Sequence, residues 1–329
     1  MELLKYNKLK IGGRLALNNL TGNLCYFNTM LQMLLSTNTT YDILMAYPKY
    51  FSKTKVGLAL YTFMKEYYEI VEHTPFGEYI PATSIHRNLF EAFSSECKRL
   101  YPKLNFPNGQ EDSLEALVKL IECTTIKHEV DNSKAIQNNI DQNDAVNPLA
   151  QLFTYKTESN YMCECSTEPI LSSQDTGIYN YFENPHKEPD DWGKHIIFKK
   201  YTVKDFKCSK CSKKADTKFT TELKLIPENI IVKFNLGDTG GIRRMRAIKP
   251  TILIGNLKYK LISSISHHGG NNGGHWNCER VYSTKHQDIN DVPHTGLFND
   301  GSIENIANGN LRNNPNILGL LYVYIGKKE

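Results

Sequence analysis

The sequence predicts an α+β fold, because helical and strand patterns occupy different parts of the chain. Apolar residues recur at helical spacing through much of the first 125 residues, and β-branched and aromatic runs bounded by Pro or Gly follow residue 150. Two closely spaced pairs of cysteines lie between the helical part and the last strands. No internal repeat interrupts this order, so the pattern favours a single unit with the size of a catalytic domain.

Helices account for the pattern of the first part. The first helix begins at Cys25 and keeps apolar residues at i, i+3 and i+4 spacing as far as Leu35. The polar residues 36–40 are expected to end it. Two further helical patterns cover residues 56–71 and 114–121.

Strands and loops account for the rest of the chain. Strands are expected at residues 217–226, 229–234, 258–266 and 317–325. Residues 129–147 are polar and without periodicity, which predicts a surface loop. Residues 171–194 contain Pro185, Pro189 and Gly193 among many polar residues, which suggests an exposed excursion.

Composition limits the classes of protein to consider. The chain has 329 residues, of which 40% are hydrophobic and 22% charged, and no apolar run reaches the length of a membrane span. The first ten residues lack the apolar core of a signal peptide, so we expect a reducing compartment. There the 8 cysteines suit metal, nucleophile or core roles better than disulfides. A net charge of +4 is too small to argue for nucleic acid or an anionic membrane as the partner.

Cys25 is a candidate nucleophile. It follows a polar loop and opens the first helix, where the positive end of the helix dipole favours the thiolate over the thiol. On position alone, a small buried core cysteine is the commoner interpretation.

Residues 22–32, GNLCYFNTMLQ, resemble the cysteine box of the ubiquitin-specific proteases. Two departures stand out: Leu24 replaces the usual Thr, and Thr21 is inserted in the preceding segment. The resemblance implies that Cys25 is the nucleophile and that Asn19, displaced by one residue, helps to form the oxyanion hole.

Two later segments resemble the remaining catalytic boxes of this family. Residues 267–276, HHGGNNGGHW, are similar to the family's His box and imply that His275 is the general base. Residues 297–303, LFNDGSI, are similar to its F-[DN]-D-S turn, which implies that Asn299 orients His275. Asp300 is the adjacent acidic candidate, and it has the stronger charge for stabilising an imidazolium. The alignment of residues 297–303 with the family turn favours Asn299 as the residue that orients His275.

The segment 110–117, QEDSLEAL, resembles the family box that faces the basic tail of ubiquitin. The resemblance assigns that role to Asp112 and Glu115, although an Asp followed three residues later by Glu is also a helix-capping pattern. Further substrate-side residues are implied by their places in the boxes: Gln32, His267, Gly274 and Trp276. Trp276 stands where Tyr is usual.

Four cysteines form a candidate metal site, namely Cys163, Cys165, Cys208 and Cys211. Four thiolates make a closed tetrahedral site for structural Zn²⁺. The resemblance implies that they are the zinc-holding fingers, with a C-x-C pair in place of the usual C-x-x-C. Unmetallated cysteines are the alternative. The remaining Cys97, Cys123 and Cys278 are expected to pack in the core.

The boxes together predict a papain-like ubiquitin-specific protease domain over residues 1–329, with a helical thumb (15–150), zinc-ribbon-like β fingers (151–225) and a β-sheet palm (226–329). We expect a monomer in the cytoplasm or nucleus of a eukaryotic cell, host cells included. Its expected partners are ubiquitin and ubiquitinated proteins, from which it releases ubiquitin at the C-terminal Gly through a Cys25 thioester.

Two alternatives stay open on the sequence. The displaced Asn19 favours a catalytically weak ubiquitin-binding module. A zinc-ribbon nucleic-acid binder is suggested by residues 208–214 with Arg243, Arg244 and Arg246, but it leaves Cys25 and His275 unexplained.

Overall fold

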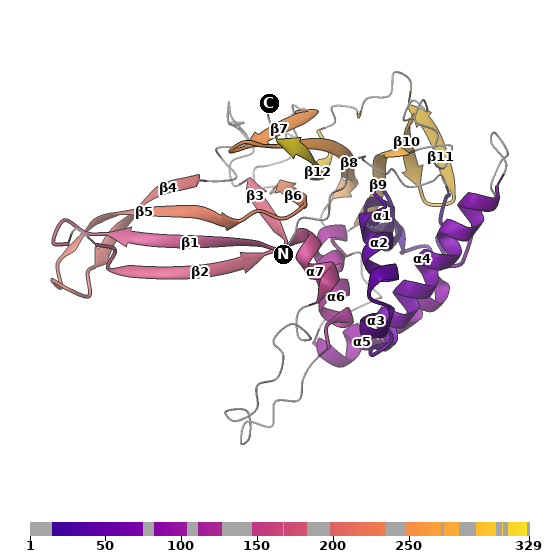
Figure 1. Cartoon of the computed structure of the whole chain (residues 1–329), viewed down its shortest axis with the longest axis horizontal. Coiled ribbons are helices and arrows are strands. Elements are labelled where there is room, and N and C mark those ends of the chain that lie inside the picture. The colour runs from indigo at the N-terminus through magenta and orange to yellow at the C-terminus, as the bar shows by residue number, and fades with distance from the viewer. Residues whose placement is uncertain are drawn as a thin grey trace. The chain divides into compact units, whose positions relative to one another are not determined.

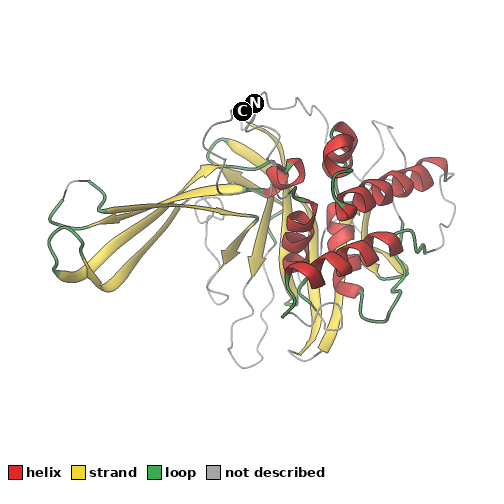
Figure 2. Ribbon diagram, turned by 90° about the horizontal axis from the view of Figure 1, so that it is seen from below, coloured by secondary structure: helices red, strands yellow, loops and turns green. Residues whose placement is uncertain are grey.

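The computed structural model describes residues 15–74, 82–103, 111–126, 147–166, 168–182, 198–234, 248–270, 273–282, 294–306, 311 and 315–327. The chain forms two compact units. Unit 1 comprises Met1–Leu152, Asp238–Ile248 and Ile262–Leu321, and unit 2 comprises Phe153–Gly237, Lys249–Leu261 and Tyr322–Glu329. Figure 1 labels their helices and strands, and Figure 2 separates the two types of element by colour. None of the helices in the described ranges combines the length and apolar content that crossing a membrane requires.

Helices fill the first part of unit 1, as the sequence predicts. They are α1 (Cys25–Leu34), α2 (Thr39–Ala46), α3 (Pro48–Phe51), α4 (Lys55–His73), α5 (Arg87–Leu100), α6 (Ser113–Thr124) and α7 (Pro148–Phe153). Helix α1 is buried along its whole length, and its Phe27 packs against Phe90 and Phe93 of α5 at ring-centroid distances of 5.3 and 5.4 Å. The helix that begins at Cys25 is therefore a central element of the fold.

The three expected helices are confirmed with small shifts of their ends. The polar run 36–40 does follow the end of α1 at Leu34, but α2 already begins at Thr39. Pattern reading missed α2 because threonine is a poor helix former, whereas burial of Thr39, Thr40, Ile43 and Leu44 stabilises the helix here. The predicted loop at 129–147 lies outside the described residues except for Asn147.

A β-sheet completes unit 1. It contains β9 (Gly273–Tyr282), β10 (His294–Asn299), β11 (Ser302–Ile306) and the unit 1 portions of β8 (Leu257–Gly270) and β12 (Ile317–Lys327), in the order β11-β10-β9-β8-β12. The pairing of β8 with β9 sets His268 opposite His275 and His267 opposite Trp276. The expected end of β8 at Ser266 is therefore wrong, since strand pairing continues through the histidines as far as Gly270.

Unit 2 consists mainly of strands. Its four-stranded antiparallel sheet has the order β2-β1-β5-β4, with β1 (Tyr155–Met162), β2 (Leu171–Gly177), β4 (Phe198–Lys207) and β5 (Lys214–Leu225), which lie side by side in Figure 1. A further pair is β3 (Tyr179–Phe182) parallel to β6 (Asn229–Phe234), while β7 (Thr251–Ile254) pairs with the start of β8. The expected excursion at 171–194 is wrong as far as residue 182, because β2 and β3 occupy it. Its remainder lies outside the described residues.

The three cysteines expected to pack in the core are buried in unit 1. Cys97 of α5 and Cys123 of α6 face each other with sulfurs 3.8 Å apart. Cys278 of β9 is fully buried, and burial raises the pKa of its thiol to about 12. The predicted core role of these residues is confirmed.

Candidate active site

Cys25 is the first residue of α1 and is itself buried. The residue before it, Leu24, caps the helix without a side-chain hydrogen bond, since its side chain is apolar. A thiol at the first position of a helix lies near the first-turn N–H groups and the positive end of the helix dipole, which favour the thiolate form. Gly22 supplies the turn into the helix with a φ of +79°, a value that most L residues avoid.

The loop that precedes α1 is held in place on both sides. Leu17 forms a bridge with Thr83, and the side-chain amide of Asn18 donates to the carbonyl of Ala82 at 3.2 Å. Within the loop, the backbone N–H of Leu24 donates to Asn19 Oδ1 at 3.0 Å. These bonds fix the orientation of the Asn19 amide directly in front of the helix.

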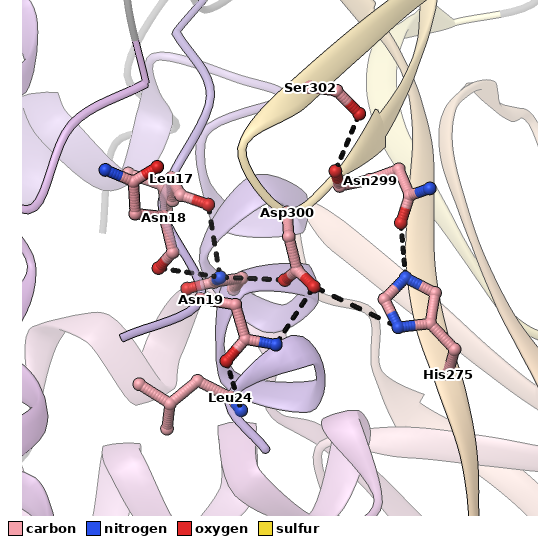
Figure 3. Close-up of polar contacts among 9 residues, drawn as sticks. Leu17, Asn18, Asn19, Leu24, His275, Asn299, Asp300 and Ser302 are labelled. Carbon is pink, nitrogen blue, oxygen red and sulfur yellow. Dashed lines mark hydrogen bonds and ion pairs between the residues drawn. The ribbon is translucent and has the colours of Figure 1, made fainter. Parts of the chain in front are cut away.

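His275 meets Asn299 through its Nε2 atom, which forms a short hydrogen bond with Asn299 Oδ1 (Figure 3). An amide oxygen can only accept, so Nε2 must carry the hydrogen. In the neutral imidazole, Nδ1 is therefore the unprotonated nitrogen that can accept a proton. The turn that carries Asn299 is closed by Ser302, whose hydroxyl donates to the Asn299 carbonyl at 2.9 Å.

Asp300 connects this turn to the start of α1. Its Oδ2 accepts from Asn19 Nδ2 at 3.1 Å and its Oδ1 accepts from Asn28 Nδ2 at 2.9 Å. Its Oδ2 also lies 3.9 Å from His275 Nδ1. Asp300 has a φ of 45°, a left-handed conformation that aspartate tolerates better than most residues. Figure 3 shows how these side chains converge from the loop before α1, from β9 and from the turn after β10.

The structure thus gathers Asn19, His275, Asn299 and Asp300, and it adds Asn28, to which sequence reasoning gave no role. Asn28 is 2% exposed, and its Nδ2 also donates to the carbonyls of Leu17 and Asn18 at 3.2 Å. The available signal was its place three residues after Cys25, which puts both side chains on one face of the helix.

Three of the residues expected on the substrate side are buried. Gln32 is 2% exposed, and its Nε2 donates to the Leu15 carbonyl at 2.9 Å. The Gln32 amide is therefore bonded inside the fold, and its contact with substrate stays a prediction. The rings of His267 and Trp276 pack against each other with centroids 4.7 Å apart and planes tilted by 41°, and both residues are also buried. Gly274 is exposed, and a Cβ there would lie 2.5 Å from His267 Nε2, so packing requires a glycine.

Asp112 is the N-cap of α6. Its Oδ1 accepts from the backbone N–H of Leu114 at 2.8 Å and of Glu115 at 3.1 Å, so the predicted capping role is confirmed. Glu115 lies in the first turn of α6 and is exposed. The Glu111–Lys119 ion pair at 3.1 Å was not predicted. Gln110 lies outside the described residues.

Unit 2 contains the cysteine cluster. The sulfurs of Cys163, Cys165, Cys208 and Cys211 all lie within 4.8 Å of one another. Two of these separations are 3.9 Å (Cys163 to Cys211) and 3.6 Å (Cys165 to Cys208). Ligands about 2.3 Å from a tetrahedral ion are about 3.8 Å apart, so the cluster has the dimensions of a four-thiolate metal site. Backbone hydrogen bonds from Cys211 and Lys210 lower the pKa of Cys208 to about 7, whereas hydrogen bonding to Cys163 raises the pKa of Cys165 to about 12.

Comparisons with known proteins agree with this arrangement. A family model described as ubiquitin carboxyl-terminal hydrolase matches residues 16–322. A comparison with curated protein sequences gave no significant match. The fold is similar to that of the SAGA DUB module of Ubp8, Sgf11, Sus1 and Sgf73 bound to monoubiquitin, with a TM-score of 0.69, 14% identity and coverage of 96% of this chain and 70% of that one.

Two further solved structures have the same fold. The SAGA Ubp8/Sgf11/Sus1/Sgf73 DUB module bound to ubiquitin aldehyde gives a TM-score of 0.67 at 16% identity, covering 97% of this chain and 71% of that one. A yeast SAGA DUB module with a mutant Sgf73 gives a TM-score of 0.67 at 15% identity, covering 97% of this chain and 70% of that one. With its family model spanning nearly the whole sequence, the chain belongs to the ubiquitin carboxyl-terminal hydrolase family and is a deubiquitinating cysteine protease with the ubiquitin-specific protease fold.

Proposed function

We propose that Cys25 is the nucleophile of this protease, with His275 as general base and Asn299 as the residue that orients it. The observation that carries the proposal is the hydrogen bond of His275 Nε2 to Asn299 Oδ1, on a turn whose next residue, Asp300, is bonded to the loop and helix of Cys25. That bond leaves Nδ1 as the basic nitrogen of the neutral imidazole.

The proposed reaction begins with transfer of the Cys25 thiol proton to His275 Nδ1. The thiolate then attacks the carbonyl carbon of the C-terminal Gly of ubiquitin, and the carbonyl oxygen takes the negative charge. Collapse of this intermediate breaks the C–N bond, and the imidazolium gives its proton to the leaving amine. Water, deprotonated by the same imidazole, then hydrolyses the thioester and restores the Cys25 thiol.

Asn19 and the Cys25 backbone N–H are the proposed oxyanion donors. The Asn19 amide carries two N–H bonds, of which one goes to Asp300. The other is assigned to the oxyanion, and the adjacent Asp300 carboxylate holds the amide in that orientation. The inserted Thr21 therefore does not argue against catalysis, because Asn19 is still tied to Leu24 in front of the helix. This favours a protease over a module that only binds ubiquitin.

The same geometry assigns different roles to the two neighbours Asn299 and Asp300. Asn299 contacts the imidazole nitrogen that faces away from the thiol in the proposed reaction. Asp300 lies 3.9 Å from the other nitrogen and already accepts hydrogen bonds from two asparagines. Asp300 is thus proposed to organise the loop of Asn19, and Asn299 to fix the imidazole.

Ubiquitin is the proposed protein partner, and its Arg-containing C-terminal tail is proposed to pass Glu115. The exposed carboxylate of Glu115 suits bidentate pairing with an Arg side chain. Asp112 uses one carboxylate oxygen to cap α6, so its contribution to the tail is proposed to be the smaller one.

The cysteine cluster is proposed to hold one structural Zn²⁺. All four proposed ligands are thiols, which Zn²⁺ prefers in closed sites, and such a site leaves no open position for chemistry. The ion would join the turn after β1 to the turn between β4 and β5. Its expected contribution is to folding free energy.

Reaction with a ubiquitin probe tests the nucleophile. Ubiquitin with a C-terminal electrophile should form a one-to-one covalent adduct, detected by intact mass, and Cys25→Ala should abolish it. Cys97→Ala is the matched control, because that thiol is buried away from the site and its loss should leave labelling per folded molecule unchanged. Persistent labelling of Cys25→Ala would assign the nucleophile elsewhere, and tight binding of ubiquitin without any adduct would indicate a binding module.

Steady-state kinetics test the tail contact. Glu115→Ala should raise the KM for a ubiquitin substrate about tenfold with little change in kcat, because a charge-assisted pair with Arg contributes roughly 1.5–3 kcal/mol to binding. Glu122→Ala, which removes a carboxylate from the other end of α6, is the matched control. Equal KM values for both variants and the parent protein would limit Glu115 to a role in the helix.

Elemental analysis tests the metal site. We expect one zinc per chain in the purified protein and its loss in Cys208→Ser, whereas Cys123→Ser should retain it. Removal by a chelator should lower the Tm, since metal binding and folding of such sites are coupled. A metal-free preparation with the same Tm and activity would contradict the proposal.

A further inference from the structure

Arg280 of β9 is the largest fully buried side chain in the described part of the protein. Its guanidinium donates from Nε to Gln32 Oε1 at 3.0 Å and from Nη1 to the Leu35 carbonyl at 2.8 Å, both on the chain of α1. A third bond runs from Nη2 to the Tyr67 hydroxyl of α4 at 2.9 Å. The guanidinium also lies 4.2 Å from the ring centroid of Phe298. One cation therefore contacts the helix of Cys25 and the residue that precedes Asn299.

The contact with α1 is made at a specific end of that helix. Leu35 is the C-cap of α1, where backbone carbonyls lack helical partners and the helix dipole is negative. A buried cation at this position satisfies a carbonyl and complements the dipole. Cys25 occupies the opposite end of the same helix, so Arg280 holds the far end of the element that presents the sulfur.

Arg280 is also a common point from which the lengths of α1 and β9 up to the site can be compared. From Leu35 back to Cys25 there are ten helical steps of about 1.5 Å, or about 15 Å. From Arg280 back to His275 there are five strand steps of about 3.3 Å, or about 16 Å. The two elements thus reach nearly the same distance from the guanidinium, with the nucleophile and the base at their ends.

The far ends of the two elements are linked as well. Asp300 accepts a hydrogen bond from Asn28 of α1 and lies 3.9 Å from His275 Nδ1 of β9. Helix and strand are therefore joined at two places, by Arg280 at one end and through Asp300 at the other. Sliding α1 along β9 would break the bonds of Arg280 to Gln32 and to Leu35 together.

We propose that Arg280 is a positioning residue that sets the register of α1 against β9, and thereby the separation of Cys25 Sγ from His275 Nδ1. This inference rests on the proposed roles of those two residues. Arg280 touches no reacting atom. Its effect is transmitted through the backbone of the helix and of the strand, in contrast to a buried arginine that only stabilises the core.

Substitution of Arg280 by Met, an apolar side chain of similar length, tests this role. Per folded molecule, Arg280→Met should lower kcat for a ubiquitin substrate by about 10²-fold, the cost of a misplacement of about 1 Å, with KM changed by less than about twofold. The pH profile of Cys25 alkylation by iodoacetamide should shift to higher pH, because the thiolate loses the closely held imidazolium. Arg280→Lys, which keeps the cation but not the forked geometry, should give an intermediate loss.

Tyr67→Phe is the matched control. It removes the bond of Arg280 to α4, a helix that carries no proposed catalytic residue, so Tm should fall while kcat and the alkylation profile stay unchanged. Folded Arg280→Met with the kcat and alkylation profile of the parent protein would overturn the proposal, whatever its Tm. If Arg280→Met does not fold, Gln32→Leu decides, with Gln32→Glu as its control. Both variants lose the bond from Gln32 to the Leu15 carbonyl, but only Gln32→Leu also loses the acceptor for Arg280. An alkylation profile shifted in Gln32→Leu alone supports the proposal, and a profile shifted in both variants or in neither overturns it.

The alkylation measurement needs no ubiquitin, which separates this inference from the proposed function. Parent protein that shows no reaction with the ubiquitin substrate, but whose Cys25 alkylation profile shifts in Arg280→Met, would contradict the proposed substrate and support the positioning role.

Discussion

The site depends on the carboxylate of Asp300, which accepts hydrogen bonds from Asn19 and from Asn28. Residues more than 270 positions apart are joined by these two bonds, and the turn after β10 is thereby fixed to the loop and helix of Cys25. Because Asn299 is the residue before Asp300, its amide oxygen is fixed by the same turn. The orientation of His275 follows from that oxygen, since a pure acceptor demands the hydrogen on Nε2. Replacement of Asp300 would loosen the turn after β10, the loop before α1 and α1 together.

Helix α1 connects this polar network to the core. Its N-terminus presents Cys25 among backbone N–H groups, and its C-terminus meets the buried guanidinium of Arg280. Each end of the helix dipole thus faces a group of suitable charge, since the thiolate proposed to form on Cys25 lies at one end and the Arg280 cation at the other. The apolar packing of Phe27 against α5 holds the helix between them. Stability of the core and activation of the thiol are therefore properties of one element.

Much of the fold and the identity of the candidate residues could be predicted from the sequence. The periodicity of α1, α4 and α6 and the composition of β6 and β12 reflect local burial, which pattern reading detects. Cys25, His275 and Asn299 came from ordered motifs. The motif placed Gln32 on the substrate side but gave no sign of its bond to Arg280, and no motif gave Arg280 a role, because these two partners lie on separate elements. Helix α2 and the extension of β8 also depend on tertiary contacts that override local propensity.

The central claim is that the turn at Asn299 and Asp300 holds His275 with its hydrogen on Nε2, leaving Nδ1 to take the Cys25 proton. The ¹⁵N chemical shifts of the His275 imidazole, measured in Cys25→Ala at a pH where the ring is neutral, report this tautomer directly. We expect a protonated Nε2 and an unprotonated Nδ1. The double variant Cys25→Ala/Asn299→Ala should lose this preference for one tautomer. A neutral ring with its hydrogen on Nδ1, or a tautomer unaffected by Asn299→Ala, would contradict it.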